Sequence, residues 1–180
     1  MTITSIKGIQ VGHHTHPDSP TGCTVIICPE NTIAGVDIRG ASPGTRETDL
    51  LDPTNTVKHI NAIVLSGGSA FGLDTATGVM RYLESKGIGL KVGNHCIPIV
   101  PAAVIFDLNV SKTPFRPDAL SGYLACKNSN NDPVIQGNVG AGTGATVSKV
   151  FGNAVKGGLG SSLIEVGPWQ VGALVVVNAL

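Results

Sequence analysis

Charged side chains are scarce in this sequence. Only 13% of its 180 residues are Asp, Glu, Lys or Arg, and 12 basic residues balance 12 acidic ones. Nucleic-acid-binding domains normally carry a basic patch or stripe, so this composition argues against nucleic acid as a partner. Hydrophobic residues make up 42% of the chain, which is enough for the core of one domain over residues 1–180. A surface with so few charges is expected to be covered in part by partners.

Apolar runs of membrane-spanning length and paired cysteines are also missing. No apolar stretch is long enough to cross a bilayer, and residues 1–8 do not resemble a signal peptide. The four cysteines, Cys23, Cys28, Cys96 and Cys126, include no C-x-x-C pair. We interpret them as reduced, small apolar residues of a cytoplasmic protein, and we expect no metal or other cofactor.

Glycine, in contrast, is abundant, with 24 residues that gather in turns. An apolar stripe of helical period, from Leu73 to Leu83, predicts a helix that ends near Lys86. Pro117 and Asp118 predict the start of a second helix, in which Leu120 faces the core. The expected strands cover residues 21–28, 32–39, 61–65, 97–108, 161–166 and 171–178, the first two as a hairpin. Interspersed strands and helices favour an α/β or α+β class with layered sheets.

A glycine-rich turn joins the strand at residues 61–65 to the first helix. Its sequence, Gly67-Gly68-Ser69-Ala70-Phe71, lacks the second glycine of the G-x-S-x-G nucleophile elbow. Ser69 is therefore a weak candidate for a nucleophile, and a tight turn with a helix cap is one alternative. We favour a third interpretation, in which the N–H groups of Gly67, Gly68 and Ser69 help to line a pocket for an anionic group.

Two other patterns point weakly to ligands. The segment Gly140–Gly144 differs from the dinucleotide-binding pattern G-x-G-x-x-G, because its third glycine comes one residue early. His13, His14 and His16 resemble a metal cluster, but apart from Asp18 in a proline-flanked loop no Cys or carboxylate accompanies them at metal-binding spacing. We interpret these histidines as residues of a surface loop.

Lys149 and Asn178 are the strongest candidates for chemistry. Asn178 ends an apolar strand, where Asn is unfavourable, so it is either a strand-end cap or a donor to an oxyanion. Lys149 lies in a glycine-rich, weakly charged neighbourhood and is either solvated or placed to assist proton transfer or hold a charge. The sequence ends two residues after Asn178 on an apolar strand, and we expect the protein to continue in another polypeptide.

The whole chain resembles the N-terminal part of the DmpA-type family of self-processing aminopeptidases. This family includes L-aminopeptidase/D-esterases, β-peptidyl aminopeptidases and nylon-oligomer hydrolases. The resemblance rests on nine stretches that follow one another in family order. They are Val11-Gly-His, Pro20-Thr-Gly-Cys-Thr-Val, Asp37-Ile-Arg-Gly, Leu65-Ser-Gly-Gly-Ser-Ala-Phe-Gly-Leu, Val100-Pro-Ala-Ala-Val-Ile-Phe-Asp-Leu, Arg116-Pro-Asp, Gly140-Ala-Gly-Thr-Gly-Ala, Lys156-Gly-Gly-Leu-Gly-Ser and Leu174-Val-Val-Val-Asn.

The resemblance implies an αββα sandwich like that of the N-terminal nucleophile hydrolases, completed by a second chain or segment. It implies a precursor that cuts itself before a Ser or Thr, which becomes the nucleophile, with its own α-amino group as the base. That residue would lie on a companion chain, so this chain alone would be inactive. We therefore expect a homo-oligomer of processed pairs that acts on peptides or related amides without nucleic acid or membrane.

The resemblance also assigns roles to single residues. Asn178 matches the family's oxyanion-stabilising Asn, and Lys149 matches an active-site Lys of the nylon-hydrolase branch. Phe106 occupies the place of a Tyr in that branch, so we expect it to shape the substrate pocket without a phenol hydrogen bond. Two other functions stay open at this point. One is an acyltransferase of the ornithine-acetyltransferase type, and the other is a non-enzymatic module that binds an anionic ligand with its glycine turns.

Overall fold

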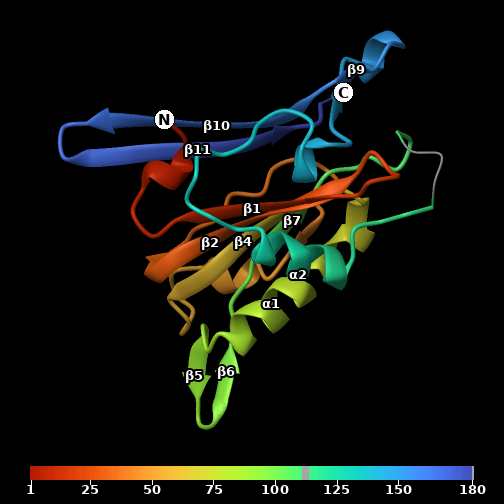
Figure 1. Cartoon of the computed structure of the whole chain (residues 1–180). Coiled ribbons are helices and arrows are strands. Elements are labelled where there is room, and N and C mark those ends of the chain that lie inside the picture. Colours follow the sequence, from red (N-terminus) through yellow and green to blue (C-terminus); the bar gives the residue numbers. More distant parts are fainter. Residues whose placement is uncertain (111–113, 180) are drawn as a thin grey trace.

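A five-stranded mixed sheet forms the centre of the molecule (Figure 1). The computed structural model describes residues 1–110 and 114–179. In the sheet, β4 and β7 pair in parallel and the other neighbours pair antiparallel, which confirms the predicted α/β class. In the order β1-β2-β4-β7-β3, the strands are β1 (Gln10–Thr15), β2 (Gly22–Ile33), β4 (His59–Ser66), β7 (Ala102–Val104) and β3 (Thr45–Arg46).

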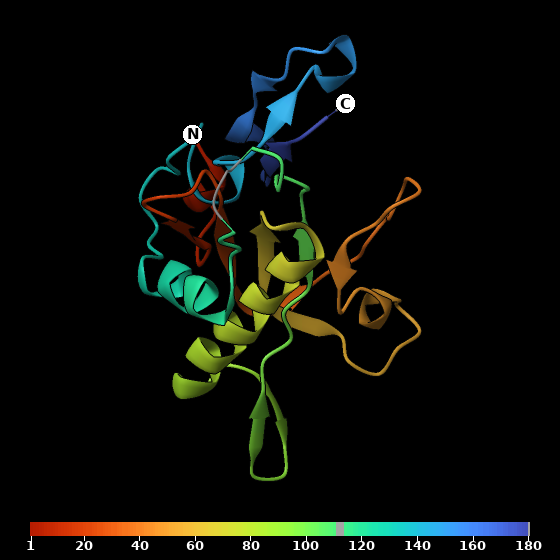
Figure 2. The same ribbon diagram turned by 90° about the vertical axis from the view of Figure 1, so that its right-hand side faces the viewer.

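Two helices pack against each other on one face of this sheet (Figures 1 and 2). Helix α1 (Thr75–Ser85) follows the predicted stripe, since Ala76, Val79 and Leu83 are completely buried. Helix α2 (Ala119–Lys127) begins at the predicted place because Asp118 Oδ1 accepts a hydrogen bond of 2.9 Å from the Ser121 N–H. The inner sides of both helices and of the sheet form the main core.

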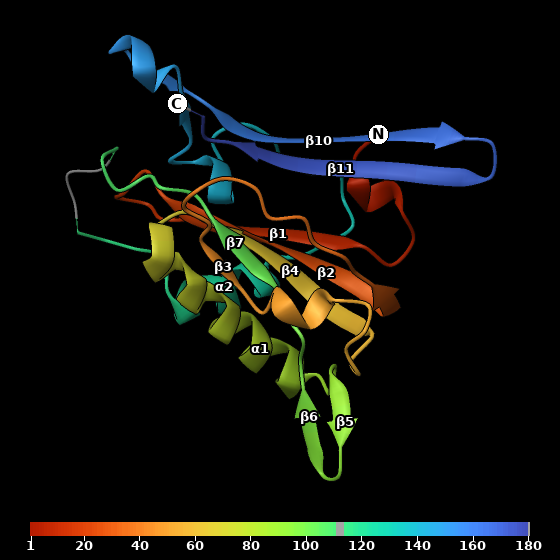
Figure 3. The ribbon, with the colours of Figure 1, turned by 180° about the vertical axis from the view of Figure 1, so that it is seen from behind.

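A long hairpin covers part of the opposite face (Figure 3). It consists of β10 (Gly158–Val166) and β11 (Trp169–Val177), close to the two predicted strands. A second apolar cluster between hairpin and sheet contains Val11, Ile26 and Leu159. The chain therefore has three layers, with helices, sheet and hairpin stacked in that order.

The remaining elements are short. The hairpin of β5 (Leu90–Val92) and β6 (His95–Ile97) projects away from the sheet (Figure 2). Strands β8 (Thr146–Val147) and β9 (Val155–Lys156) pair near the end of β11. The 3₁₀ helices are η1 (Ile3–Ser5), η2 (Asp49–Leu51), η3 (Ser69–Asp74), η4 (Gly140–Gly142) and η5 (Lys149–Phe151).

Three expectations from the sequence are wrong. The chain does not turn back near Glu30, because a bulge in β2 lets its pairing with β4 continue to Ile33, and residues 34–39 form no strand. The single strand predicted over residues 97–108 is interrupted, since Pro98 and Pro101 lack N–H groups for a ladder. Leu120 is 62% exposed, because α2 turns its small residues toward α1.

All four cysteines are free thiols, as predicted, with Cys23 and Cys126 buried and Cys28 and Cys96 half-buried. Within residues 1–110 and 114–179, no helix has the length and apolar character needed to cross a membrane.

Leu83→Ala should lower the free energy of unfolding by about 2–5 kcal/mol, because it leaves a cavity between α1 and the sheet. Chemical denaturation of the full-length protein measures this change. Leu120→Ala is the matched control, since that exposed side chain fills no space in the core and its loss should cost no more than about 0.5 kcal/mol. Equal losses for the two variants would contradict the packing described for the helices.

Candidate active site

The structure brings Asn178, Lys149 and Phe106 together where β11 ends. Asn178 Oδ1 accepts hydrogen bonds from Lys149 Nζ at 2.9 Å and from the Thr146 N–H at 3.0 Å. Asn178 Nδ2 donates a hydrogen bond of 3.0 Å to the Phe106 carbonyl oxygen. One side chain thus joins the end of β11 to the β8–η5 turn and to the segment that follows β7.

The Lys149 ammonium group is held by three acceptors. Besides Asn178 Oδ1, its Nζ donates to the carbonyl oxygens of Thr146 and Ala179, each at 2.9 Å. An ammonium group has three N–H donors, so these bonds use all of them. The left-handed backbone of Ser148, with φ of 62°, turns the chain so that Lys149 points back to the end of β11. Lys149 is therefore built to hold a fixed positive charge beside Asn178.

These donors also fix the orientation of the Asn178 amide. The Lys149 ammonium and the Thr146 N–H can only donate, so the atom that faces them must be the carbonyl oxygen. The amide NH₂ group then faces Phe106, and one of its two hydrogens goes to the Phe106 carbonyl. Within the described part of the chain, no acceptor takes the second hydrogen. A fixed donor with one hydrogen to spare is what an oxyanion requires.

A cavity of about 430 Å³ lies beside this cluster. Two lysines line it, and the second, Lys156, donates through Nζ to the Thr143 carbonyl oxygen. Burial lowers the pKa of Lys156, and the nearby Asp107 carboxylate partly offsets this shift. Two lysines and the Asp107 carboxylate line the cavity, so positive groups outnumber negative ones on its wall. The lining residues are Phe106, Asp107, Asn109, Val110, Thr146, Lys149, Ala154 and Lys156.

Asp107 is a site residue that the sequence interpretation missed. Its side chain is 3% exposed, and both carboxylate oxygens have partners. Oδ1 accepts from the Gly68 N–H and Oδ2 accepts from the Thr21 hydroxyl, each at 2.7 Å. A carboxylate buried at this depth is stable only when it is bonded in this way. The signal available in the sequence was an Asp inside the otherwise apolar run Val104–Leu108.

Two glycines leave the space that the Asp107 carboxylate occupies. A methyl group at Gly67 would overlap Asp107 Oδ2 and lie 2.9 Å from its carboxyl carbon. A methyl group at Gly144 would overlap the same oxygen and lie 2.6 Å from both Asp107 Cβ and the Pro20 carbonyl oxygen. The glycine segments around residues 67 and 144 therefore pack against one carboxylate.

The turn at Gly67, Gly68 and Ser69 has a different role from the predicted one. All three N–H groups have acceptors inside the protein: the Gly22 carbonyl, Asp107 Oδ1 and the Ile105 carbonyl, respectively. The idea that these groups stay open for an anion is therefore wrong for this structure. Ser69 does not cap the helix either, since Gly68 is the N-cap of η3 and its cap has no side-chain hydrogen bond. The turn supports the segment Ile105–Asp107 instead.

The loop prediction holds for His16, which follows β1, and is wrong for the other two histidines. His13 and His14 belong to β1, and His13 Nδ1 lies 2.9 Å from the Thr24 hydroxyl. Burial lowers the pKa of His13. Among residues 1–110 and 114–179, no three His, Cys, Asp or Glu side chains come together in a way that could hold a metal ion.

Sequence comparison places the chain among known proteins. The sequence profile described as peptidase family S58 matches residues 1–180. An uncharacterized aminopeptidase of Mycobacterium leprae is 46% identical over 196 residues, with 99% of this chain and 52% of that protein covered. A 6-aminohexanoate-oligomer endohydrolase of Kocuria is 31% identical over 172 residues, with 95% and 46% covered. The chain thus spans about half the length of the curated relatives that it matches.

Solved structures share the fold. A protein of Pyrococcus horikoshii superposes with a TM-score of 0.74 at 26% identity, covering 98% of this chain and 54% of its own. The L-aminopeptidase D-Ala-esterase/amidase of Ochrobactrum anthropi gives a TM-score of 0.73 at 20% identity, with 98% and 53% covered. The latter structure is described as a new variant of the Ntn hydrolase fold, which confirms the predicted fold class.

Gly144→Ala should destabilise the protein by about 1–3 kcal/mol, because the added methyl group forces the Asp107 carboxylate from its place. Thermal unfolding of the full-length protein measures the loss. Gly160→Ala is the matched control, since its methyl group would meet only Gln136 Oε1 at 3.7 Å. A Gly144→Ala protein as stable as the control would show that the carboxylate is not confined by the glycine segments.

Proposed function

Because the chain belongs to peptidase family S58, we propose that the full-length protein is an amide hydrolase that removes N-terminal residues from peptides or related amides. The observation that carries the proposal is the Asn178 amide, oriented by Lys149 beside the cavity. Relatives named as an aminopeptidase and as a 6-aminohexanoate-oligomer endohydrolase support an amide substrate.

Asn178 stabilises the tetrahedral oxyanion in this proposal. Attack on an amide carbonyl moves negative charge onto its oxygen, and a donor already in place costs no reorganisation at that moment. The second hydrogen of Asn178 Nδ2 serves as that donor. Lys149 adds a positive charge 2.9 Å from the amide oxygen, which polarises the amide and strengthens its N–H groups as donors. The lysine therefore acts through the asparagine, because its own three donors are already used.

The nucleophile is a Ser or Thr at the N-terminus of a companion chain, which self-cleavage of a longer precursor would release. Its α-amino group would serve as the base, as in other enzymes with an N-terminal nucleophile. The length of the curated relatives, about twice that of this chain, leaves room for such a segment. The free thiols suit a cytoplasmic location, which we include in the proposal.

The companion chain would cover apolar surfaces that the described residues leave open. On β11, Val171, Val175 and Val177 are exposed in alternation, and in the described part of the chain β11 pairs only with β10. An unpaired edge beside an apolar face is a place where another strand can add. We propose that the companion chain continues the β10–β11 sheet here, and that processed pairs assemble into a homo-oligomer.

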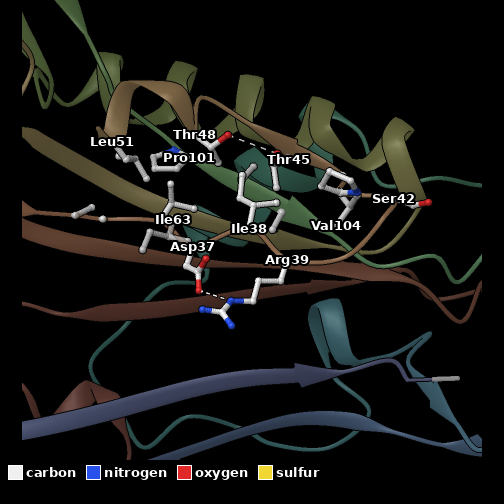
Figure 4. A pocket seen from close by; sticks show the side chains of 17 residues that line it. Asp37, Ile38, Arg39, Ser42, Thr45, Thr48, Leu51, Ile63, Pro101 and Val104 are labelled. Atoms are coloured by element: carbon white, nitrogen blue, oxygen red, sulfur yellow. Dashed lines mark hydrogen bonds and ion pairs between the residues drawn. The ribbon is translucent and has the colours of Figure 1, made fainter. Parts of the chain in front are cut away.

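A second open surface adjoins the same space. A pocket of about 440 Å³ lies between residues 34–39 and the strands β4 and β7. In Figure 4, Ile38 lies among Ile63, Pro101 and Val104, while Asp37 and Arg39 form an ion pair at the rim. Its apolar floor belongs to the face of the sheet that carries the β10–β11 hairpin, so further strands beside β11 would cover it.

Self-processing is tested by the intact mass of the full-length protein under denaturing conditions. We expect two polypeptides, one of which begins with Ser or Thr. Replacement of that residue by Ala should leave a single uncut chain. A full-length protein that stays uncut and yet hydrolyses amides would contradict the proposed nucleophile.

Asn178→Ala in the processed enzyme should lower kcat on the order of 100-fold or more with little change in KM, because the lost bond forms in the transition state. Release of p-nitroaniline from L-alanine and β-alanine p-nitroanilides measures the rate. The control is Asn94→Ala, at the exposed tip of the β5–β6 hairpin. Undiminished turnover by Asn178→Ala would remove the oxyanion role, and transfer of the acyl group to ornithine in preference to water would favour a transferase.

A further inference from the structure

We propose that Asp107 is a positioning residue that acts together with Lys149 and Thr146 to fix the orientation of the Asn178 amide, and that it does so through the Phe106 carbonyl group. The inference rests on the proposed function, because it treats Asn178 as the donor to the oxyanion. It adds a residue that touches neither Asn178 nor the reacting atoms directly. Three observations carry it: the anchoring of Asp107, the anchoring of Ile105, and the exposure of Phe106 between them.

Asp107 is anchored more firmly than its neighbours. Its carboxylate, which is 3% exposed, accepts from the Gly68 N–H and from the Thr21 hydroxyl at 2.7 Å each. Hydrogen bonds to a charged acceptor are stronger than bonds between neutral groups. Gly67 and Gly144 pack against the carboxylate so closely that a methyl group on either would overlap Asp107 Oδ2.

Ile105 is anchored to the same turn. Its N–H donates to the Ser66 carbonyl oxygen at 2.9 Å, and its own carbonyl oxygen accepts from the Ser69 N–H at 3.0 Å. Together with the bond from Gly68 to Asp107, these contacts tie both neighbours of Phe106 to the turn after β4. The peptide groups on either side of Phe106 are thereby fixed in direction.

In the described part of the chain, Phe106 has no comparable anchor besides the bond that its carbonyl oxygen accepts from Asn178. Its side chain is 51% exposed, so packing of the ring contributes little to holding the backbone. The direction of its carbonyl group is therefore set by the neighbouring residues. This carbonyl oxygen accepts from Asn178 Nδ2 at 3.0 Å. A shift of Asp107 would consequently be transmitted to the amide group.

The consequence for catalysis follows from the planarity of the amide. Once one N–H of Asn178 is directed at Phe106, the direction of the second N–H is fixed as well. Hydrogen bonds weaken steeply as their angle departs from linearity, and a misplacement of about 1 Å in an active site can cost on the order of 100-fold in rate. Asp107 thus affects the transition state without contacting the substrate through its own carboxylate.

A double-mutant cycle in the processed full-length enzyme tests this inference. Asp107→Ala should lower kcat by about 10- to 100-fold with KM little changed. In the Asn178→Ala background the same substitution should cost no more than about threefold, because the donor that it positions is already gone. Asp107→Asn should restore most of the rate, since an amide can accept from Gly68 and donate to Thr21. The matched control is Asp132→Ala, at an exposed position.

If Asp107→Ala does not fold, Thr21→Val is used in the cycle instead, because it removes one of the two hydrogen bonds that hold the Asp107 carboxylate. If the fold-loss in kcat of the double variant equals the product of the two single fold-losses, Asp107 and Asn178 act independently. This result overturns the inference and leaves the proposed function in place.

A second readout does not depend on hydrolysis. The ¹H–¹⁵N signal of the Asn178 side-chain amide, identified by its loss in Asn178→Asp, should shift in Asp107→Ala and Thr21→Val and stay in place in Asp132→Ala. If the signal shifts but the wild-type protein hydrolyses no aminoacyl amide, the positioning contact stands and the proposed function fails. A signal that stays in place in both variants overturns the inference.

Discussion

A buried carboxylate is the constraint on which the rest of the site depends. An unpaired charge at the depth of Asp107 would cost several kcal/mol, so the fold must bring donors to it. The Gly68 N–H and the Thr21 hydroxyl supply them, and the glycines at positions 67 and 144 allow their segments to approach. Segments that are far apart in the sequence therefore meet at one point, and the composition of the chain, rich in glycine and poor in charge, suits such close contacts.

The Asn178 amide is the second point where separate segments converge. It links the end of β11 with the β8–η5 turn through Lys149 and Thr146, and with the segment after β7 through Phe106. Each partner has an obligatory role as donor or acceptor, so the amide has a single orientation. This arrangement gives a physical reason for an asparagine at the end of an apolar strand, where a strand-end cap would need no lysine. It is also why an amide hydrolase fits the geometry better than a module that binds an anion with glycine turns.

Apolar surface is left exposed at two places in the described part of the chain. Three layers are present in the described residues, and both β11 and the pocket below residues 34–39 present apolar surface on the same side. Exposed apolar area of this kind usually marks a contact surface. The relatives are about twice as long as this chain, and the companion segment proposed above would account for the low surface charge.

Several features could be predicted from the sequence because they depend on neighbouring residues. The stripe of α1, the Asp118 cap of α2 and the β10–β11 strands follow from local periodicity and capping. Local patterns failed near Ile33. Alternation in the sequence predicted a hairpin there, but the bulge that keeps β2 paired with β4 depends on a strand about thirty residues away.

The residues of the candidate site also include some that could be predicted from the sequence and some that could not. Asn178 and Lys149 stood out because each residue type is unusual in its surroundings, and the resemblance to a family gave each of them a role. Asp107 did not stand out, and the open N–H groups expected at Gly67–Ser69 are in fact bonded within the protein. The sequence alone determined which chemical groups the chain carries and where its helices begin. Only the tertiary structure decided which of those groups meet, because hydrogen bonds between distant segments depend on the packing of the whole chain.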